Sequence, residues 1–401
     1  MKVLISGAGI AGPTLAYWLH HYGHSVTLVE KSPSLRTNGY VIDFWGLGFD
    51  VVEKMGILDT VLSKGYKVQE LLLVNDKGER VGGFALNLMA EQLNGRFTSL
   101  PRGELASCIF ETIAGKVETI FGDSIASLEE KDTEIVVSLE RNGKKSFDIV
   151  VGCDGLHSNV RQLGFPESER DNIEVYLGFK VAACQVSSYP FSDASAYVSF
   201  ATPGKSLSRF SLRDDKTLLL FIYHDSNPEV PKTLEERKQE VHRVFDGEGW
   251  ECKDALACLD TCEDVYLDSV TQIQMSNWTK GRVALVGDAA ACPSLLAGEG
   301  SGLAIVEAYV LAGELNAYGD QFSKAFENYE QTLKAFITKK QESARGFAGA
   351  FAPKTALGLF LRNWISRLLG IPFLARWMLK SLKDDLILPD YENNACQRGT
   401  G

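Results

Sequence analysis

The chain has 401 residues, of which 45% are hydrophobic and 23% charged, and its formal net charge at pH 7 is −11. This composition is that of a globular protein large enough for two lobes. The negative charge argues against a nucleic-acid partner and against electrostatic binding to anionic membranes. No uncharged run is long enough to span a bilayer. The eight cysteines are scattered without paired spacing, which predicts no metal site and reduced thiols in a cytoplasmic protein.

A glycine-rich turn follows the first predicted strand. Residues 1–6 have the apolar character of a strand, and residues 13–21 continue as a helix. Between them, Gly7, Gly9 and Gly12 have the spacing of a dinucleotide-binding turn, in which the backbone approaches a pyrophosphate at the helix N-terminus. Glu30 ends the next predicted strand, at about the distance from the turn expected of the acid that binds a ribose hydroxyl. This motif alone does not separate FAD from NAD.

Two further motifs follow predicted strands much later in the chain. Asp154 comes after residues 146–152, and Asp288 comes after residues 281–286. Three separated motifs indicate one long ligand held by distant parts of the chain, and FAD is the leading candidate. The helix predicted from Gly300 can stabilise negative charge on a reduced flavin ring with its N-terminus. Taken alone, Asp288 could be a solvated acid, and Asp154 could belong to a turn with a helix cap.

The segments between the motifs predict an interleaved α/β fold. Residues 172–275 alternate between apolar and polar side chains with intervening turns, which is typical of an antiparallel sheet. We expect this sheet to bind substrate. The expected Rossmann-like, three-layer FAD-binding domain is made of two parts, residues 1–171 and 276–340. Residues 341–401 form a C-terminal helical segment, in which residues 355–382 are predicted to pack over the protein instead of lying on a membrane surface.

These motifs together resemble the class A flavoprotein aromatic monooxygenases, the para-hydroxybenzoate hydroxylase family, over nearly the whole chain. The resemblance is carried by Gly7-x-Gly9-x-x-Gly12 with Glu30, Arg102, Asp154-Gly155-x-x-Ser158-x-Val160-Arg161, and Gly287-Asp288-Ala289-Ala290 with Pro293 and Gly298-x-Gly300. Within the family, residues 272–315 and Leu388-Pro389-Asp390-Tyr391 are most similar to the tetracycline-inactivating flavin monooxygenases.

The resemblance implies non-covalent FAD in an extended pose, with NADPH or NADH docking only transiently. It places Glu30 at the adenosine ribose, Arg36 and Arg102 on the pyrophosphate side and Asp288 on the ribityl side, while Asp154 serves both FAD and the nicotinamide. The expected cofactor-binding residues are Gly7, Gly9, Ala11, Gly12, Glu30, Lys31, Arg36, Arg102, Asp154, Asp288, Pro293, Gly298, Gly300 and Ser301. In this family O2 adds at C4a of the reduced flavin, and the hydroperoxide transfers one oxygen atom to an electron-rich ring. No side chain is therefore assigned as catalytic.

The sequence departs from the family pattern at two places. Members often carry Gly-Gln-Gly-x-Asn near the flavin ring, where this chain has Gly298-Glu299-Gly300-Ser301-Gly302. Ala291 stands where many members have histidine. These changes are expected to leave FAD binding intact and to affect ring contacts and hydroxylation efficiency.

The substrate is expected to be a small phenolic, polycyclic aromatic or polyketide molecule, with tetracycline-like antibiotics among the candidates. It should lie between the antiparallel sheet and the flavin. The candidate lining residues are Arg209, Arg213, Phe221, Tyr223, His224, Pro293 and Leu296. Alternation puts Phe221 and Tyr223 on one face, but the sequence leaves open which face points inward. The alternatives are a flavin oxidase or reductase of the same fold and a non-enzymatic flavin redox sensor. The protein is expected to be a monomer or homodimer.

Overall fold

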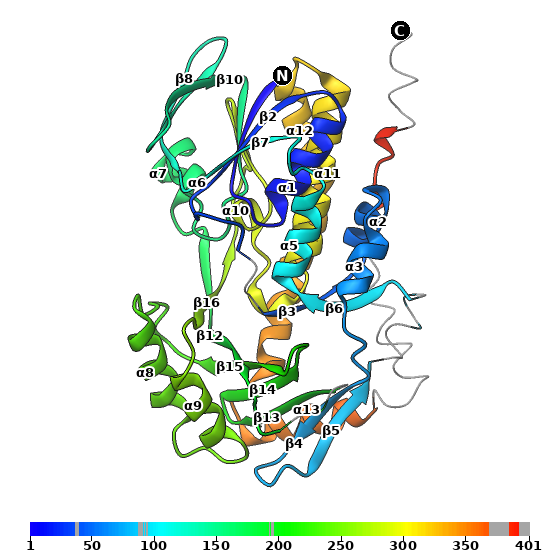
Figure 1. The fold of residues 1–401 in the computed structure, drawn as a ribbon, viewed down its shortest axis with the longest axis vertical. Coiled ribbons are helices and arrows are strands. Elements are labelled where there is room, and N and C mark those ends of the chain that lie inside the picture. The colour runs from blue at the N-terminus through cyan, green and yellow to red at the C-terminus, as the bar shows by residue number, and fades with distance from the viewer. Residues whose placement is uncertain are drawn as a thin grey trace.

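The computed structural model describes residues 1–36, 40–86, 91, 93, 95–191, 193, 196–368 and 385–392. Over these residues the chain forms two lobes along its long axis, one above the other in Figure 1. The upper lobe contains a mainly parallel sheet, and the lower lobe contains a mainly antiparallel sheet. This arrangement confirms the predicted α/β fold with an interleaved antiparallel part.

The upper sheet has the strand order β17-β18-β11-β1-β2-β7. Its central strand, β1 (Lys2–Ser6), pairs in parallel with β2 (Ser25–Glu30) and β11 (Ile149–Gly152), so that Val3 lies opposite both Val26 and Ile149. Every residue of β1 after Lys2 is buried, because both faces of the sheet are covered. The outer strands are β7 (Glu118–Phe121), β18 (Val283–Leu285) and the antiparallel β17 (Thr279–Lys280).

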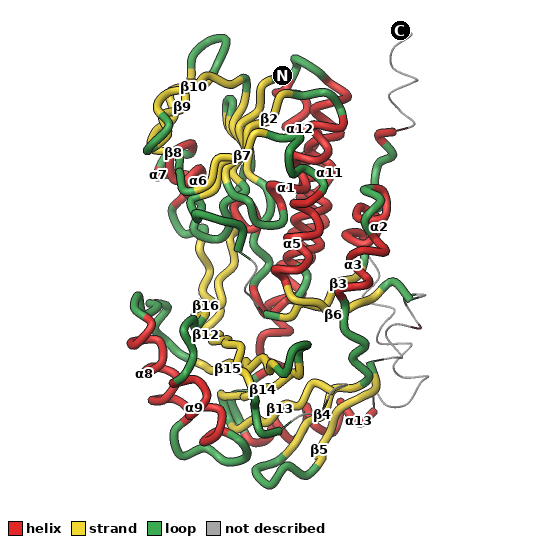
Figure 2. The backbone as a smooth tube through the Cα atoms, in the orientation of Figure 1, coloured by secondary structure: helices red, strands yellow, loops and turns green. Residues whose placement is uncertain are grey.

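Helices cover one face of the upper sheet, and a three-stranded sheet covers the other (Figures 1 and 2). The large helices on the first face are α1 (Ala11–His21), α5 (Arg102–Glu111), α11 (Gly300–Tyr318) and α12 (Phe322–Phe351), with α2 (Leu47–Lys54) and α3 (Leu58–Lys64) beside them. The small sheet consists of β8 (Ile125–Glu130), β9 (Ile135–Leu139) and β10 (Gly143–Phe147). Short helices follow the strands at α6 (Asn159–Gly164), α7 (Glu167–Arg170) and α10 (Asp288–Ala291).

The lower sheet has the strand order β16-β12-β15-β14-β13-β4-β5. Its strands are β12 (Glu174–Ser187), β13 (Ala196–Thr202), β14 (Lys205–Ser211), β15 (Lys216–His224), β16 (Tyr266–Ile273), β4 (Glu70–Val74) and β5 (Arg80–Ala85). Neighbouring strands are antiparallel except for β4 and β13. The helices α8 (Leu234–Phe245) and α9 (Cys252–Asp260) cover one face. The strands β12 and β16 rise toward the upper lobe and connect the two (Figure 2).

Two domain boundaries differ from the sequence-based expectation. Residues 70–85 were assigned to the first FAD-binding segment, yet β4 and β5 extend the lower sheet, with Glu70 paired to Ala196. The expected boundary at residue 340 falls inside α12, a 30-residue helix about 45 Å long that runs from the upper lobe into the lower one. Between the lobes, β3 (Val41–Trp45) and β6 (Phe97–Pro101) pair as a small antiparallel sheet.

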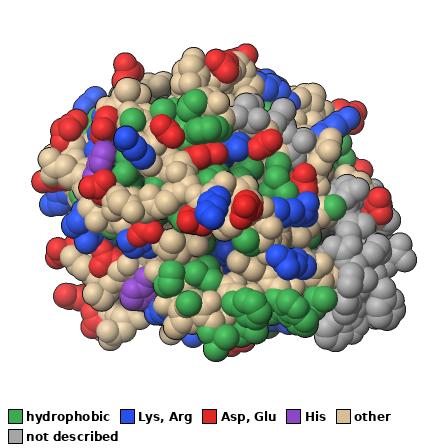
Figure 3. Space-filling model, turned by 90° about the horizontal axis from the view of Figure 1, so that it is seen from below, with side chains coloured by type: hydrophobic (Ala, Val, Ile, Leu, Met, Phe, Trp, Pro, Cys, Tyr) green, Lys and Arg blue, Asp and Glu red, His purple; other side chains and the backbone are tan. Residues whose placement is uncertain are grey.

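The C-terminal segment contributes one more described helix, α13 (Ala356–Leu368), which packs on β5. The Ser366 hydroxyl accepts a hydrogen bond from the Gly83 amide at 2.9 Å. Residues 369–382 of the predicted helix lie outside the described residues. In Figure 3 hydrophobic side chains gather at one edge of the lower lobe; the exposed apolar residues of α13 are Leu357, Phe360, Leu361, Trp364 and Ile365. Among the described helices, none has the length and apolar character needed to cross a membrane.

Candidate active site

The turn between β1 and α1 requires glycine at two positions. Gly7 has a φ of +106°, and a Cβ there would stand 2.5 Å from the carbonyl oxygen of Cys153. A Cβ on Gly12 would overlap the carbonyl oxygen of Gly7. The first motif is therefore pressed against the end of β11, where the second motif begins at Asp154.

The third motif reaches the same place from the other side. A Cβ on Gly287 would stand 3.5 Å from the Cβ of Ala11, at the start of α1. The Oδ1 atom of Asp288 lies 3.6 Å from the position of a Cβ on Gly300, at the start of α11. The N-termini of α1 and α11 thus meet near Asp288, and their partial positive charges favour an anionic ligand there.

Glu30 ends β2 with its carboxylate directed at the glycine turn. Its Oε2 accepts a hydrogen bond from the Ala8 amide at 2.8 Å, and its Oε1 accepts one from the Ser32 amide at 2.9 Å. Burial would raise the pKa of Glu30, but these hydrogen bonds and the Arg36 guanidinium, 3.5 Å away, hold the pKa below its usual range. Arg36 also donates to the Ser32 hydroxyl, so the structure groups it with the predicted ribose acid. Lys31 is exposed.

Arg102 lies over the glycine turn, as its predicted contact with a pyrophosphate requires. It is the first residue of α5, and its amide donates to the Tyr40 carbonyl at 3.0 Å. Its Nη2 lies 3.6 Å from the position that a Cβ on Gly9 would take. A side chain at residue 9 would therefore separate the guanidinium from the turn, whereas glycine leaves both open to one phosphate.

Asp154 has a structural task in addition to any contact with a cofactor. Its carboxylate accepts hydrogen bonds from the Ser158 hydroxyl and from the amides of Asn159 and Val160, at 2.9 and 3.0 Å. Burial raises its pKa despite these hydrogen bonds. The sequence left open the interpretation that Asp154 belongs to a turn with a helix cap. These hydrogen bonds at the start of α6 agree with that interpretation.

Arg161 links the second motif to the third, a role that the sequence did not reveal. It is almost completely buried, and its guanidinium donates to the carbonyls of Leu156 and Ala289, at 2.5 and 2.9 Å. One side chain from α6 thus fixes the loop after Asp154 against the backbone of α10.

The loop after α10 holds an unusual backbone conformation. Ser294 has a φ of +130°, which is sparsely populated for any residue other than glycine. Its hydroxyl is buried, and no hydrogen-bond partner for it exists among the described residues. Gly298 ends the loop in the left-handed region. Strain and an unsatisfied buried donor in one loop are features of a surface shaped for a polar ligand.

Two glutamines, which no sequence motif singled out, hold this loop in place. The Gln272 side chain donates to the carbonyls of Pro293 and Gln341, each at 2.7 Å. The Gln341 side chain donates to the carbonyls of Ile273 and Cys292, at 2.6 and 3.1 Å. Pro293 is itself buried, and its contacts with FAD and with substrate stay predictions.

Taken together, the described residues fit FAD. A charged acid at the end of β2, an arginine over a glycine turn, and Asp288 near two helix N-termini are the kinds of groups that the ribose, pyrophosphate and ribityl parts of FAD are expected to need. The orphaned Ser294 hydroxyl supplies a polar group near the start of α11.

Glu299, where the sequence departs from the family pattern, forms an ion pair with a residue of α12. Glu299 precedes the first residue of α11, and its Oε1 lies 3.0 Å from Nζ of Lys340. The pair borders a small hollow of about 20 Å³ between β3, α11 and α12. Other residues lining this hollow include Asp43, Trp45, Gly298, Gly302 and Phe336.

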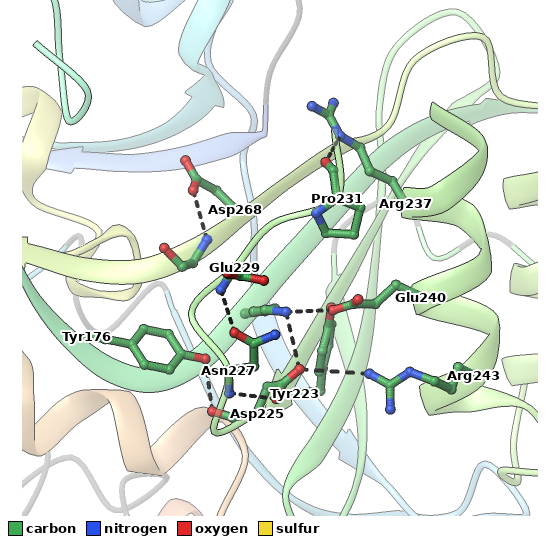
Figure 4. Close-up of polar contacts among 12 residues, drawn as sticks. Tyr176, Tyr223, Asp225, Asn227, Glu229, Pro231, Arg237, Glu240, Arg243 and Asp268 are labelled. Carbon is green, nitrogen blue, oxygen red and sulfur yellow. Dashed lines mark hydrogen bonds and ion pairs between the residues drawn. The ribbon is translucent and has the colours of Figure 1, made fainter. Parts of the chain in front are cut away.

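Three of the predicted substrate residues face away from this region. Phe221 and Tyr223 lie in the layer between the lower sheet and α8, where both rings contact Phe245 edge to face. The Tyr223 hydroxyl donates to Glu240 on α8 at 2.7 Å (Figure 4), and Lys180 pairs with the same carboxylate at 2.8 Å. Arg209 lies on that face as well, 2.8 Å from Glu251. These positions correct the expectation for Phe221, Tyr223 and Arg209, because their polar and apolar contacts are already made within the lower lobe.

Arg213 lies in the turn between β14 and β15, and His224 ends β15. The Arg213 guanidinium donates to the carbonyls of Lys64 and Gly65, at 2.8 and 2.6 Å, and lies 4.4 Å from the centroid of the Tyr66 ring. His224 is exposed. The structure therefore does not bring these two residues together with Pro293.

The opposite face of the lower sheet points toward the loop between α10 and α11, residues 292–299, which is called the flavin loop below. Ile222, the neighbour of Tyr223, belongs to an apolar cluster with Leu296 and Ala352, against which Leu220 also packs. Leu296 thus lies against the lower sheet, and its contact with substrate stays a prediction. Further along the same face lie the aromatic residues Tyr40, Tyr66, Tyr197, Phe210 and Tyr266. The sequence showed that side chains alternate between the two faces of this strand. The structure was needed to show which face lies toward the loop after α10.

Comparison with known proteins identifies the family. Residues 1–342 match the family model described as FAD binding domain. A flavin-dependent monooxygenase of Legionella longbeachae serogroup 1 (strain NSW150) is 30% identical over 417 residues, covering 98% of this chain and 99% of the relative.

Two crystal structures of tetracycline destructases are similar over almost the whole chain. Tet(51) has a TM-score of 0.84 at 28% identity, covering 97% of this chain and 99% of the other. Tet(55) has a TM-score of 0.83 at 31% identity, covering 97% and 98%. The chain therefore belongs to the FAD-binding-domain family and is an FAD-dependent monooxygenase.

Proposed function

We propose that this enzyme hydroxylates a phenolic or polycyclic aromatic molecule of the polyketide type, with tetracycline-like antibiotics as the first candidates. The observation that carries this proposal is the aromatic and apolar face of the lower sheet that lies against the flavin loop. Flat, electron-rich rings match such a surface, since aromatic pairs gain energy beyond simple burial. The similarity to two tetracycline destructases supports the same substrate class, and with it a role in antibiotic resistance.

The side chains of this protein bind and orient, while FAD supplies the activation of O2 when it is bound. In the proposed site Glu30 holds the adenosine ribose, Arg102 the pyrophosphate, and Asp288 with Ser294 the ribityl and ring end. The apolar cluster of Ile222, Leu296 and Ala352 excludes water from the side where substrate enters. NADPH or NADH acts as a transient reductant.

The proposed location is the cytoplasm, and the proposed state is a monomer or homodimer. The location is supported by the free cysteines, because the seven within the described residues form no disulfide.

The proposal is tested by measuring NADPH and NADH consumption with tetracyclines and with a panel of phenols and polyphenols. We expect at least one polycyclic phenol to stimulate consumption and to gain one oxygen atom from labelled O2, detected by mass spectrometry. Consumption that yields only hydrogen peroxide with every compound would identify an oxidase or reductase. Bound FAD with no substrate-dependent consumption would identify a redox sensor.

A further inference from the structure

An ion pair stands at the N-terminus of α11. The Glu299 carboxylate and the Lys340 ammonium lie 3.0 Å apart and are only 17% and 16% exposed. The ammonium also lies 5.6 Å from the centroid of the Phe336 ring on the same helix. Both charges are therefore held in fixed positions and are partly removed from water.

The pair lies beside the ring end of the proposed FAD site. Glu299 is bonded directly to Gly300, and a Cβ on Gly300 would stand 3.6 Å from Asp288. Both Glu299 and Lys340 line the hollow that Gly298 and Gly302 also border. The hollow contains one more acid, Asp43, whose pKa is raised by burial in spite of a hydrogen bond from Ser99, so that its charge is disfavoured.

These positions set the local charge that a bound flavin ring experiences. The N-terminus of α11 favours negative charge, whereas an unpaired Glu299 carboxylate at the same point opposes it. Reduction adds negative charge to a flavin, so the balance between these two effects changes the reduction potential. Lys340 cancels the carboxylate and leaves the positive end of the helix dominant.

We propose that Lys340 is a positioning residue for catalysis: by neutralising Glu299 it keeps the start of α11 favourable for the reduced flavin, and the two residues together set the flavin reduction potential. This inference rests on the proposed binding of FAD at this end of α11.

The test is a double-mutant cycle on the full-length protein loaded with FAD. Lys340→Met keeps the side-chain length and removes the charge, and Glu299→Gln keeps the side-chain shape and removes the opposite charge. The readouts are the midpoint potential, measured by equilibration with redox dyes, and the dissociation constant of FAD, measured by flavin fluorescence. Lys334→Met is the matched control, because Lys334 lies on the same helix and pairs with Glu330 at 3.6 Å, away from the hollow.

We expect Lys340→Met to lower the midpoint potential and to weaken binding of reduced flavin about tenfold relative to oxidised flavin. Glu299→Gln should move the potential in the opposite direction, and the double variant should return it close to that of the wild type. Lys334→Met should leave the potential unchanged. If Lys340→Met does not fold, Glu299→Gln alone still tests the proposal, since it is expected to raise the potential.

Equal potentials in the wild type and all foldable variants, with changes only in thermal stability, would show that the pair merely joins α11 to α12. That result overturns this inference and leaves the proposed function standing. A wild-type protein that binds no FAD would overturn both.

Discussion

The ring of Tyr391 occupies the space that a side chain on Gly313 would need. A Cβ built on Gly313 overlaps three atoms of this ring, and the Tyr391 hydroxyl donates to the buried Glu314 carboxylate at 2.6 Å. The ring also meets Tyr309 on α11 at 5.4 Å between centroids. Residues 385–392 therefore pack on α11 by placing the Tyr391 ring in a socket at Gly313. Any residue larger than glycine at position 313 would fill this socket.

We expect Gly313→Ala to destabilise the protein by about 1–3 kcal/mol, because overpacking displaces the tyrosine ring. Urea denaturation measures the change. The same substitution at Gly346 on α12, where nothing lies within 4 Å, is the control and should be neutral or stabilising. Much of the cost at Gly313 should disappear in a Tyr391→Ala background, and equal costs in both backgrounds would contradict the socket.

Two adjacent residues of β15 should separate stability from activity. Tyr223→Phe leaves the Glu240 hydrogen bond unmade on the α8 side, so we expect a lower melting temperature and an unchanged KM. Ile222→Ala opens a cavity beside Leu296, so we expect a raised KM for substrate and more NADPH lost to hydrogen peroxide. Steady-state kinetics on both variants decides between the faces, and a KM effect at Tyr223 with none at Ile222 would reverse our assignment.

Glu307 should make stability depend on pH. It is buried, it accepts a hydrogen bond from the Gly287 amide at 2.6 Å, and burial raises its pKa from 4.5 to about 8. The folded protein thus keeps a proton that the unfolded chain releases. This contribution to stability is complete below pH 4.5 and is lost as the pH rises to about 8.

Between pH 5 and pH 8 we therefore expect the wild type to lose about 1–4 kcal/mol more stability than Glu307→Gln. The glutamine keeps an acceptor for Gly287 and cannot ionise. Denaturation curves at both pH values measure the difference, and parallel losses in the two proteins would show that Glu307 ionises normally.

Asp288 and Asp154 should differ in their effect on FAD. The Asp154 carboxylate is engaged by α6, whereas Asp288 lies at the meeting point of two helix N-termini. We expect Asp288→Ala to weaken FAD binding about ten- to a hundredfold, as for the loss of a charge-assisted hydrogen bond. Asp154→Ala should lower the melting temperature, with a smaller effect on affinity. Flavin titration of both variants checks this order, and equal affinities would refute it.

The segment from Thr355 onward is expected to cover the substrate entrance. An internal truncation that removes residues 355–382 but keeps residues 385–392 should leave FAD bound, raise the KM for substrate, and increase the fraction of NADPH that yields hydrogen peroxide. The five exposed apolar residues of α13 make a membrane-surface role the alternative. Loss of liposome binding on truncation, with unchanged kinetics, would favour that alternative.

The sequence predicted the upper lobe well because its signals are local. A strand, a glycine turn and a helix are contiguous, and the acid follows at the end of the next strand, so that Gly7, Gly9 and Glu30 could be placed without knowing the rest. The β4–β5 hairpin could not be assigned, because Glu70 pairs with Ala196, and no local pattern encodes a partner so distant.

The substrate face and the Glu299 pair were missed for related reasons. Both faces of β15 are buried, so apolar residues on both sides of Ile222 leave no polar side to mark the outside. Lys340 lies 41 residues beyond Glu299 on a helix with many charges, and only the fold brings this one to the start of α11. Lysines are common on exposed helix surfaces. The residue type alone therefore does not distinguish Lys340, which is largely buried beside Glu299, from the exposed lysines of the same helix.

The helix α12 has a mechanical consequence for turnover. Two adjacent residues of this helix, Lys340 and Gln341, contact the flavin loop. Just beyond its last turn, Ala352 packs in one cluster with Ile222 and Leu296. A continuous helix is stiff along its axis, so a displacement of one end shifts or tilts the whole helix. Any displacement of Ala352 by a molecule bound on the lower sheet would therefore be transmitted along α12 to the contacts that Lys340 and Gln341 make with the loop after α10.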